Sequence, residues 1–272
     1  IGVRLVGSEM CIRDSTNPAV SSGPSLFVRS LGVHVTRLMR IWSREPSSLT
    51  MVIIAPLAYL FIMVKLFGAL AESLTGHFDA NAGVILVVFS WAFILAVTGT
   101  GQVYEERLHG FHDRLQTMPS RYVVVLLARA IAEFLRIFVM CIVVTAVADL
   151  FTSSSVFADA PLRAVLVFVL VSLAGGTFGT HVGFSITSPQ GSVVFMPLIM
   201  VMMFSNTALL PASMYRSGLA AIARNAPITA ASQALAGDAI LPIVLWCGGI
   251  IVVCLAGLVV LSRRRQQGVM GA

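Results

Sequence analysis

Charged residues are scarce in this chain. Only 11% of its 272 residues are charged and 57% are hydrophobic, with a mean hydropathy of +0.92. Soluble domains carry roughly 25% charged residues, so an aqueous fold could not hide this much apolar surface. The composition therefore excludes an ordinary soluble domain and predicts an all-α integral membrane protein, with lipid as solvent for much of the chain.

Lysine is almost absent. Of 18 basic residues only Lys65 is a lysine, and the arginines form short clusters between apolar runs. A net charge of +6 is also found in proteins that bind nucleic acid. However, clusters that flank apolar runs are typical of charges that set membrane topology. We therefore expect membrane lipid, and no nucleic acid, as a partner.

Motifs for catalysis, nucleotide or metal binding are missing. There is no P-loop and no GxGxxG, and none of the four cysteines forms a CxxC pair. His109 and His112 are three residues apart, but no HExxH or carboxylate pattern accompanies them. We expect no catalytic residue, metal or cofactor, and we interpret the cysteines as small apolar packing residues.

Residues 1–25 are expected to contribute nothing to function. Residues 1–15 lack an initial Met, resemble translated adapter sequence and do not have the pattern of a signal peptide. Residues 16–25 are small and polar, which predicts disorder. We interpret this segment as an artefactual or disordered amino terminus.

Six apolar runs predict six membrane spans within a transmembrane domain of residues 26–265, followed by a cytoplasmic tail of 266–272. A crossing needs about 20 residues, and the uncharged stretch from Ala164 to Tyr215 is too long for one, so the turn signal at 188–192 divides it. Residues 212–242 predict short re-entrant or interfacial helices on the outer face. The expected spans are about 48–68, 82–103, 128–150, 163–185, 193–211 and 243–261.

The third expected span carries charges. Arg129, Glu133 and Arg136 share one helical face, and Glu133 can pair with either arginine. This turn either lies near the cytoplasmic interface or faces the protein interior. In the fourth span, His181 is either a proton or substrate group or a packing residue.

Residues 26–44 are amphipathic at helical period. Apolar residues line one side and four arginines the other, which is typical of a helix lying in the membrane interface; the alternative is the first helix of a soluble domain. The apolar side holds Leu31, Val35, Leu38 and Trp42, and the basic side holds Arg29, Arg37, Arg40 and Arg44. Because arginine gathers on one side of the membrane, we expect both termini and the 104–121 loop to be cytoplasmic.

The 104–121 loop is the most charged interior segment. Its charges alternate in sign, and Leu108, Phe111 and Leu115 are spaced for one apolar face. Such a segment suits docking into the groove of another protein, but an ordinary solvated loop would look the same.

This loop resembles a motif of ABC-2 type permeases, with the pattern E-R-x-x-G-[TS]-x-x-x-L-x-x-[TL]-P. A later segment, Asn225-Ala226-Pro227-Ile228-Thr229, is similar to that family's N-P-[VL]-[TS]. In two departures, Phe111 replaces a small polar residue and Ala226 interrupts the second motif. The loop residues that match are Glu106, Arg107, Gly110, Leu115 and Pro119.

The resemblance covers about residues 26–265 and looks closest to the daunorubicin/doxorubicin-resistance permeases of actinobacteria. It implies a bacterial plasma-membrane exporter subunit that works with a separate ATPase, a second permease copy or paralogue, and an amphipathic drug, polyketide or lipid-like substrate. Spans one, two and five would line the path. The implied coupling residues are Glu105, Glu106, Arg107, Gly110, Phe111, Arg114, Leu115 and Pro119, and the implied interface-helix residues are Arg37, Arg40 and Trp42.

Two other functions stay open at this point. An ion-coupled secondary transporter would need no ATPase, although paired inverted repeats and midplane charges are not evident. A membrane enzyme or scaffold would need a convergent polar site, for which the spans offer only His181, Gln190 and Asn206.

Overall fold

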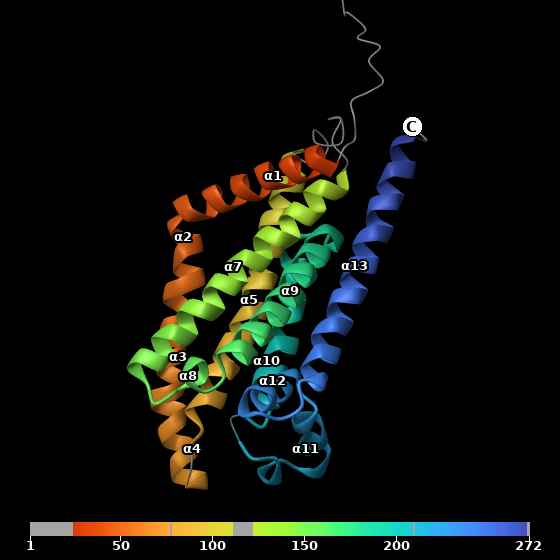
Figure 1. The fold of residues 1–272 in the computed structure, drawn as a ribbon. Coiled ribbons are helices and arrows are strands. Elements are labelled where there is room, and N and C mark those ends of the chain that lie inside the picture. The colour runs from red at the N-terminus through yellow and green to blue at the C-terminus, as the bar shows by residue number, and fades with distance from the viewer. Residues whose placement is uncertain (1–23, 77, 111–121, 209, 271–272) are drawn as a thin grey trace, which may run out of the picture.

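The computed structural model describes residues 24–76, 78–110, 122–208 and 210–270 as helices joined by short turns (Figure 1). No β-strand occurs in these ranges, so the all-α prediction is confirmed for them. Most of the expected amino-terminal segment, 1–23, and residues 111–121 of the expected coupling loop lie outside the described residues.

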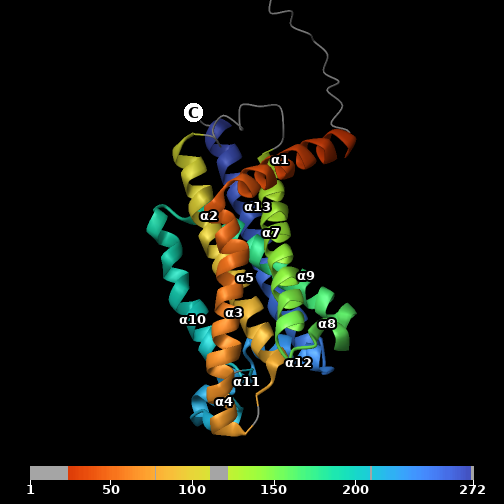
Figure 2. The ribbon, with the colours of Figure 1, turned by 90° about the vertical axis from the view of Figure 1, so that its left-hand side faces the viewer.

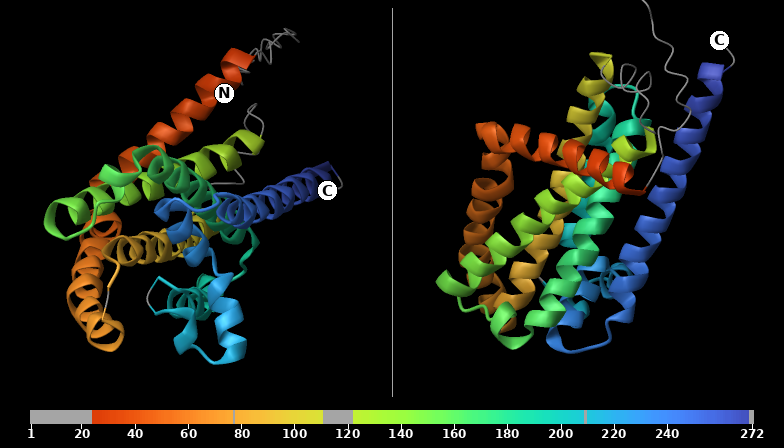
Figure 3. Two further views of the ribbon diagram at one scale, coloured as in Figure 1. Left: turned by 60° about the horizontal axis from the view of Figure 1, so that its bottom comes forward. Right: turned by 45° about the horizontal axis from the view of Figure 1, so that its top comes forward.

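Helix α1 (Pro24–Arg44) lies across one end of the bundle, at a large angle to the long helices (Figures 1 and 3). Its buried residues Leu38 and Trp42 pack against Ala132 of α7. Glu45 is extended, and Pro46 begins the next helix at a position where its missing N–H costs nothing. The amphipathic helix is therefore present, and its apolar stripe contacts another helix of the chain.

The first long helix is continuous from Pro46 to Leu74. Two wider π turns interrupt its α-helical geometry, and Pro56 explains the first, because proline has no N–H to donate to the turn before it. The helix ends at Gly76, which takes the left-handed conformation with φ of 74°. Its five pieces are α2 (Pro46–Leu49), η1 (Thr50–Ile54), α3 (Ala55–Ile62), η2 (Met63–Phe67) and α4 (Gly68–Thr75).

Helix α5 (Ala80–Leu108) is the centre of the bundle. The side chain of Asp79 caps its start by accepting hydrogen bonds from the N–H groups of Asn81 and Ala82. In its most apolar window 83% of residues are buried, against 22% for both the first and the last long helix. The outer helices therefore shield α5 from lipid.

Helices α7 (Tyr122–Phe151) and α9 (Pro161–Ser185) pack against α5 and against each other, with short α8 (Val156–Asp159) between them. Glycines allow the close approach of α9. A Cβ on Gly179 would lie 2.6 Å from the carbonyl oxygen of Ala96 on α5, and one on Gly176 would lie 2.9 Å from that of Ala130 on α7. Small residues at such positions let helix backbones meet in membranes.

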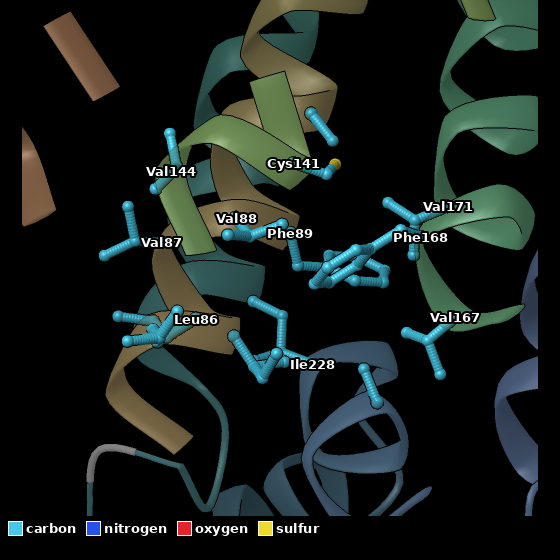
Figure 4. Close-up of a cluster of buried hydrophobic side chains, with 14 of the residues drawn as sticks. Leu86, Val87, Val88, Phe89, Cys141, Val144, Val167, Phe168, Val171 and Ile228 are labelled. Atoms are coloured by element: carbon cyan, nitrogen blue, oxygen red, sulfur yellow. The ribbon is translucent and has the colours of Figure 1, made fainter. Parts of the chain in front are cut away.

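The chain after α9 continues through short helices to α13. The pattern in 212–242 predicts short helices, and η4, α11 and α12 are found there. The core next to α12 also includes α5, α7 and α9, and Phe89, Cys141, Phe168 and Ile228 belong to it (Figure 4). The remaining elements are η3 (Pro189–Phe195), α10 (Met196–Phe204), η4 (Ala212–Met214), α11 (Ser217–Arg224), α12 (Pro227–Ala236) and α13 (Leu241–Met270).

Five helices of the described chain are long and apolar enough to cross a membrane, and each contains one of the expected runs. They are Pro46–Leu74, Ala80–Leu108, Val123–Phe151, Pro161–Ser185 and Leu241–Leu261. The expected run at 193–211 corresponds to a shorter apolar helix, Gln190–Phe204, so the prediction of six spans is not confirmed. The helix ends early because the Asn206 side chain turns back onto the carbonyl groups of Met202 and Met203.

Candidate functional site

A buried group of charges lies on the face of α7 that meets α5. The guanidinium Nη2 of Arg129 is 3.1 Å from Oε1 of Glu133, and that of Arg136 is 2.5 Å from Oε2. All three side chains are buried, and Glu133 is only 1% exposed. Of the two placements that the sequence allows, the structure shows the one that faces the protein interior.

Backbone carbonyl groups of α5 complete this site. Nη2 of Arg129 donates to the carbonyl oxygen of Gly99 at 3.1 Å, and Nη2 of Arg136 donates to that of Leu95 at 2.8 Å. Gly99 also makes room, because a Cβ there would lie 2.6 Å from Oε1 of Glu133. Buried charges are costly unless paired and hydrogen-bonded, and these contacts offset that cost.

Trp42 connects α1 to the buried charges. The guanidinium carbons of Arg129 and Arg136 lie 5.4 and 4.6 Å from the centroid of its ring, which is cation–π geometry. Its indole N–H donates to Oε1 of Gln102 at 2.9 Å, and the same oxygen accepts from Arg129 at 3.3 Å. The aromatic residue expected at the membrane interface is therefore buried between helices.

Glu106 extends the network into the 104–121 segment, whose first residues continue helix α5. Its Oε2 is 3.5 Å from Nη1 of Arg129, and its Oε1 is 3.8 Å from Nη2 of Arg37 on α1. Because Glu106 is 26% exposed, each pair contributes only about 0–1 kcal/mol. The position of Glu106 matters more than the energy of its ion pairs, because it contacts both α1 and α7 from one turn before Gly110.

Arg107 serves a different helix. Its Nη1 donates to the carbonyl oxygens of Gly183, Phe184 and Ile186, at 3.4, 3.2 and 2.9 Å. These groups lie at the end of α9, where helix carbonyls lack partners and where positive charge is favourable. The neighbours Glu106 and Arg107 thus anchor the end of α5 to three other helices.

The other predicted residues are less connected or lie outside the described part. Glu105 and Arg40 are exposed, and Gly110 adopts a φ of 67°, which favours glycine. Phe111, Arg114, Leu115 and Pro119 are outside the described residues, as is His112. Where the structure does describe His, Cys, Asp and Glu, no three of them gather as a possible metal site.

Gly99 and Gln102 are site residues that the sequence interpretation did not identify. A signal for them exists, since Gly99, Gln102 and Glu106 recur at intervals of three and four residues. Arg129, Glu133 and Arg136 have the same kind of spacing on α7. Two helices with matching stripes of polar or small residues indicate a shared buried interface.

A second polar cluster closes the turn after α10, at the opposite end of the bundle. Tyr215 Oη donates to the carbonyl oxygens of Phe204 and Asn206, and burial raises the pKa of this phenol. Buried Thr229 accepts from the N–H of Thr207 at 2.9 Å and donates to the carbonyl of Ala223. The segment that resembles the family's outer motif is therefore the support of this turn.

Comparison with known proteins identifies a family. Residues 29–237 match the family model described as ABC-2 type transporter, while no curated protein matches the chain. The matched segment includes α5, α7, α9 and the charged network, and it covers more than half of the 272 residues. With five helices able to cross a membrane, the chain belongs to the ABC-2 type transporter family and is a multi-pass membrane component of an ABC transporter, not itself an enzyme.

Proposed function

We propose that this protein is the permease subunit of an ATP-driven exporter in a bacterial plasma membrane. It carries amphipathic drug, polyketide or lipid-like molecules out of the cytoplasm, and its nearest functional group is the daunorubicin/doxorubicin-resistance permeases. Family membership supports the transport role. The sequence has no P-loop, so we place ATP hydrolysis on a separate ATPase chain.

The observation that carries the proposal is the double contact of Glu106 with Arg37 and Arg129. In the proposed mechanism, residues 104–121 dock into a groove of the ATPase, and the basic side of α1 rests on the same subunit. Movement of the docked loop then reaches α1 and α7 through Glu106, and α9 through Arg107. Rigid helices that shift together are a common form of switching transition.

We further propose six crossings with both termini in the cytoplasm. Helix η3 has seven residues at about 2.0 Å rise and α10 has nine at about 1.5 Å, which together extend about 28 Å. The hydrocarbon core of a bilayer is about 30 Å thick. In Figure 2, this segment runs from the end of the bundle near α1 toward the end that holds α11, which supports a complete crossing.

A second permease copy or paralogue is also part of the proposal. The first and last long helices are mostly exposed apolar surface, with only 22% of each window buried. Lipid and a second permease are the partners that such faces accept in a membrane.

The test is ATP-dependent export by membrane vesicles that contain the permease and an ATPase encoded beside its gene. Glu106→Gln removes one charge and both ion pairs, and we expect export to fall by about five-fold, the equivalent of about 1 kcal/mol, with membrane insertion unchanged. Glu72→Gln is the control for the same change outside the docking segment, because Glu72 is exposed at the end of the bundle away from α1. Arg107→Glu also weakens coupling, but it is a less specific test because it frees the end of α9.

Three results would contradict the proposal. The first is equal export by the Glu106→Gln and Glu72→Gln variants. The second is stable membrane insertion with no ATPase association in any partner combination. The third is proton-driven flux in ATP-depleted vesicles, which would favour the ion-coupled transporter.

A further inference from the structure

An apolar cavity of about 820 Å³ lies between α9 and α13, within a single protomer. None of its lining residues is an Asp, Glu, Lys or Arg. Both helices are among those able to cross a membrane, and no residue of the charged network lines the cavity. Cavities of about 300–1,000 Å³ hold drug-sized molecules.

A second apolar cavity of about 480 Å³ adjoins the first and is bounded by α5, α10 and the turn between α11 and α12. Four residues line both cavities: Phe178, Phe195, Trp246 and Ile250. Phe178 and Phe195 meet edge to face, with centroids 5.2 Å apart. These four residues form the wall between the two adjoining cavities, with packed aromatic rings at its middle.

His181 is a polar residue in the wall of the larger cavity. Its ring lies against Gly257 of α13, where a Cβ would be only 2.2 Å from Cε1. Its Nδ1 is buried and has no hydrogen-bond partner in the described part of the chain. Trp246, the other nitrogen-bearing ring, already donates to the carbonyl oxygen of Asn225 at 2.9 Å. Because α13 covers Nδ1, a ligand in the cavity meets the rest of the imidazole, where Nε2 is the nitrogen left for a hydrogen bond.

We propose that the larger cavity binds an amphipathic small molecule with a ring-containing apolar body and one uncharged hydrogen-bonding group. The aromatic wall contacts the rings, His181 meets the polar group, and the molecule enters from lipid. As the substrate site of the exporter, it rests on the proposed function. The expected path through spans one, two and five differs from it, because the first span contributes no lining residue.

Two adjacent glycines of α13 provide the decisive variants. Gly249 lines the larger cavity and has no atom within 4 Å of an added Cβ, so Gly249→Leu fills the cavity without colliding with the backbone. Gly248 is equally open but does not line the cavity, so Gly248→Leu is the matched control. His181→Phe keeps a ring against Gly257 and removes both nitrogens.

The probe is trifluoromethyl phenyldiazirine bearing a hydroxymethyl group, a neutral photoreactive aromatic alcohol, applied to the purified permease in lipid nanodiscs. We expect saturable labelling of the peptides that contain Phe178 and Trp246. Labelling should fall several-fold in Gly249→Leu and in His181→Phe, and it should be unchanged in Gly248→Leu. Elution as a single species in size-exclusion chromatography verifies that each variant is folded. If Gly249→Leu does not fold, the labelling of His181→Phe tests the proposal.

Competition identifies the source of the ligand. Displacement of the probe by excess benzyl alcohol, with or without displacement by a short-chain phosphatidylcholine, supports the site. Displacement by the lipid alone, non-saturable labelling of all lipid-facing helices, or equal labelling of the two glycine variants would overturn it. Labelling requires neither ATPase nor ATP, so the two proposals can be contradicted separately. The binding site can be disproved while ATP-dependent export is observed, and it can be supported while no ATPase associates with the permease.

Discussion

Glu133 has the most demanding surroundings of any residue in the described chain. Its carboxylate is buried between two guanidinium groups, and Gly99 leaves just enough space for it. The two arginines reach carbonyl oxygens of α5 only because the carboxylate compensates their charge. The free energy of this site therefore depends on one negative charge.

Glu133→Gln should destabilise the folded protein by about 3–5 kcal/mol, because it leaves two buried arginines without a counter-charge. The measurement is the midpoint of thermal unfolding in detergent. Glu105→Gln is the control for the same change at an exposed position and should alter stability by less than about 0.5 kcal/mol. Similar midpoints for both variants would show that Glu133 does not hold the site together.

His34 of α1 predicts a pH dependence. Burial, and secondarily the charge of nearby Arg37, lower its pKa below 6.5, so the neutral imidazole is favoured when α1 packs on the bundle. As pH falls below about 6.5, His34 binds a proton first in chains whose α1 has left the bundle. The packing of α1 on the bundle is therefore strongest above that pH, and it weakens as pH falls through the lower pKa that His34 has in the packed state.

The measurement for His34 is amide hydrogen exchange across residues 31–42 in nanodiscs, corrected for intrinsic rates. Exchange should be faster at about pH 5 than at about pH 8, and His34→Gln should abolish the difference. A pH effect that survives in His34→Gln would assign it to another group.

At the scale of the helix, α9 is positioned by close contact at its glycines. Gly179 meets the backbone of α5 and Gly176 that of α7, while Gly183 meets the Val103 side chain of α5 and Gly175 the Ile137 side chain of α7. A helix placed in this way cannot accept even a methyl group without moving.

Gly179→Ala should lower thermal stability, because its Cβ would meet the carbonyl oxygen of Ala96 at 2.6 Å and a backbone atom cannot rotate away. Gly101→Ala on α5 is the opposite case, with no atom within 4 Å of the added Cβ. Higher helix propensity should stabilise that variant by up to about 1 kcal/mol. Thermal midpoints of the same sign for the two variants would contradict this account of the packing.

The helices themselves were predictable to different degrees. Long apolar runs predicted five helices that the structure contains, since a run of apolar residues indicates a buried or lipid-facing environment. The run at 193–211 predicted a longer helix than the structure contains, because hydropathy does not detect the turn that Asn206 imposes. The burial of Trp42 was also not predictable, because an amphipathic stripe suits either lipid or another helix.

At the scale of the whole molecule, the described chain starts and ends at the same end of the bundle (Figure 1). With arginine clusters at 29–44 and 263–265, this arrangement supports the proposed cytoplasmic end. The sequence predicted this pairing of ends from charge asymmetry. It could not predict the partners of Glu106, which depend on how three helices converge.

Cysteine labelling in intact cells tests the six-crossing topology. In a cysteine-free background, Glu72→Cys and Asp238→Cys should react with an impermeant maleimide, because both positions are exposed at the end of the bundle away from α1. Glu105→Cys should react only after permeabilisation. A chain in which residues 189–204 do not cross would leave Asp238→Cys protected and would place a reporter fused behind residue 272 outside the cell.

The central position of α5 has a consequence for biosynthesis. Helices enter the membrane in chain order, so α5 is inserted before α7 and α9 exist to cover it. The carbonyl groups of Leu95 and Gly99 are then in place when Arg129 and Arg136 arrive. Helix α7, with its three charges, therefore inserts beside hydrogen-bond acceptors that are already in the membrane. We expect chains from which α5 has been deleted to fail when α7 inserts into the membrane, before the helices pack.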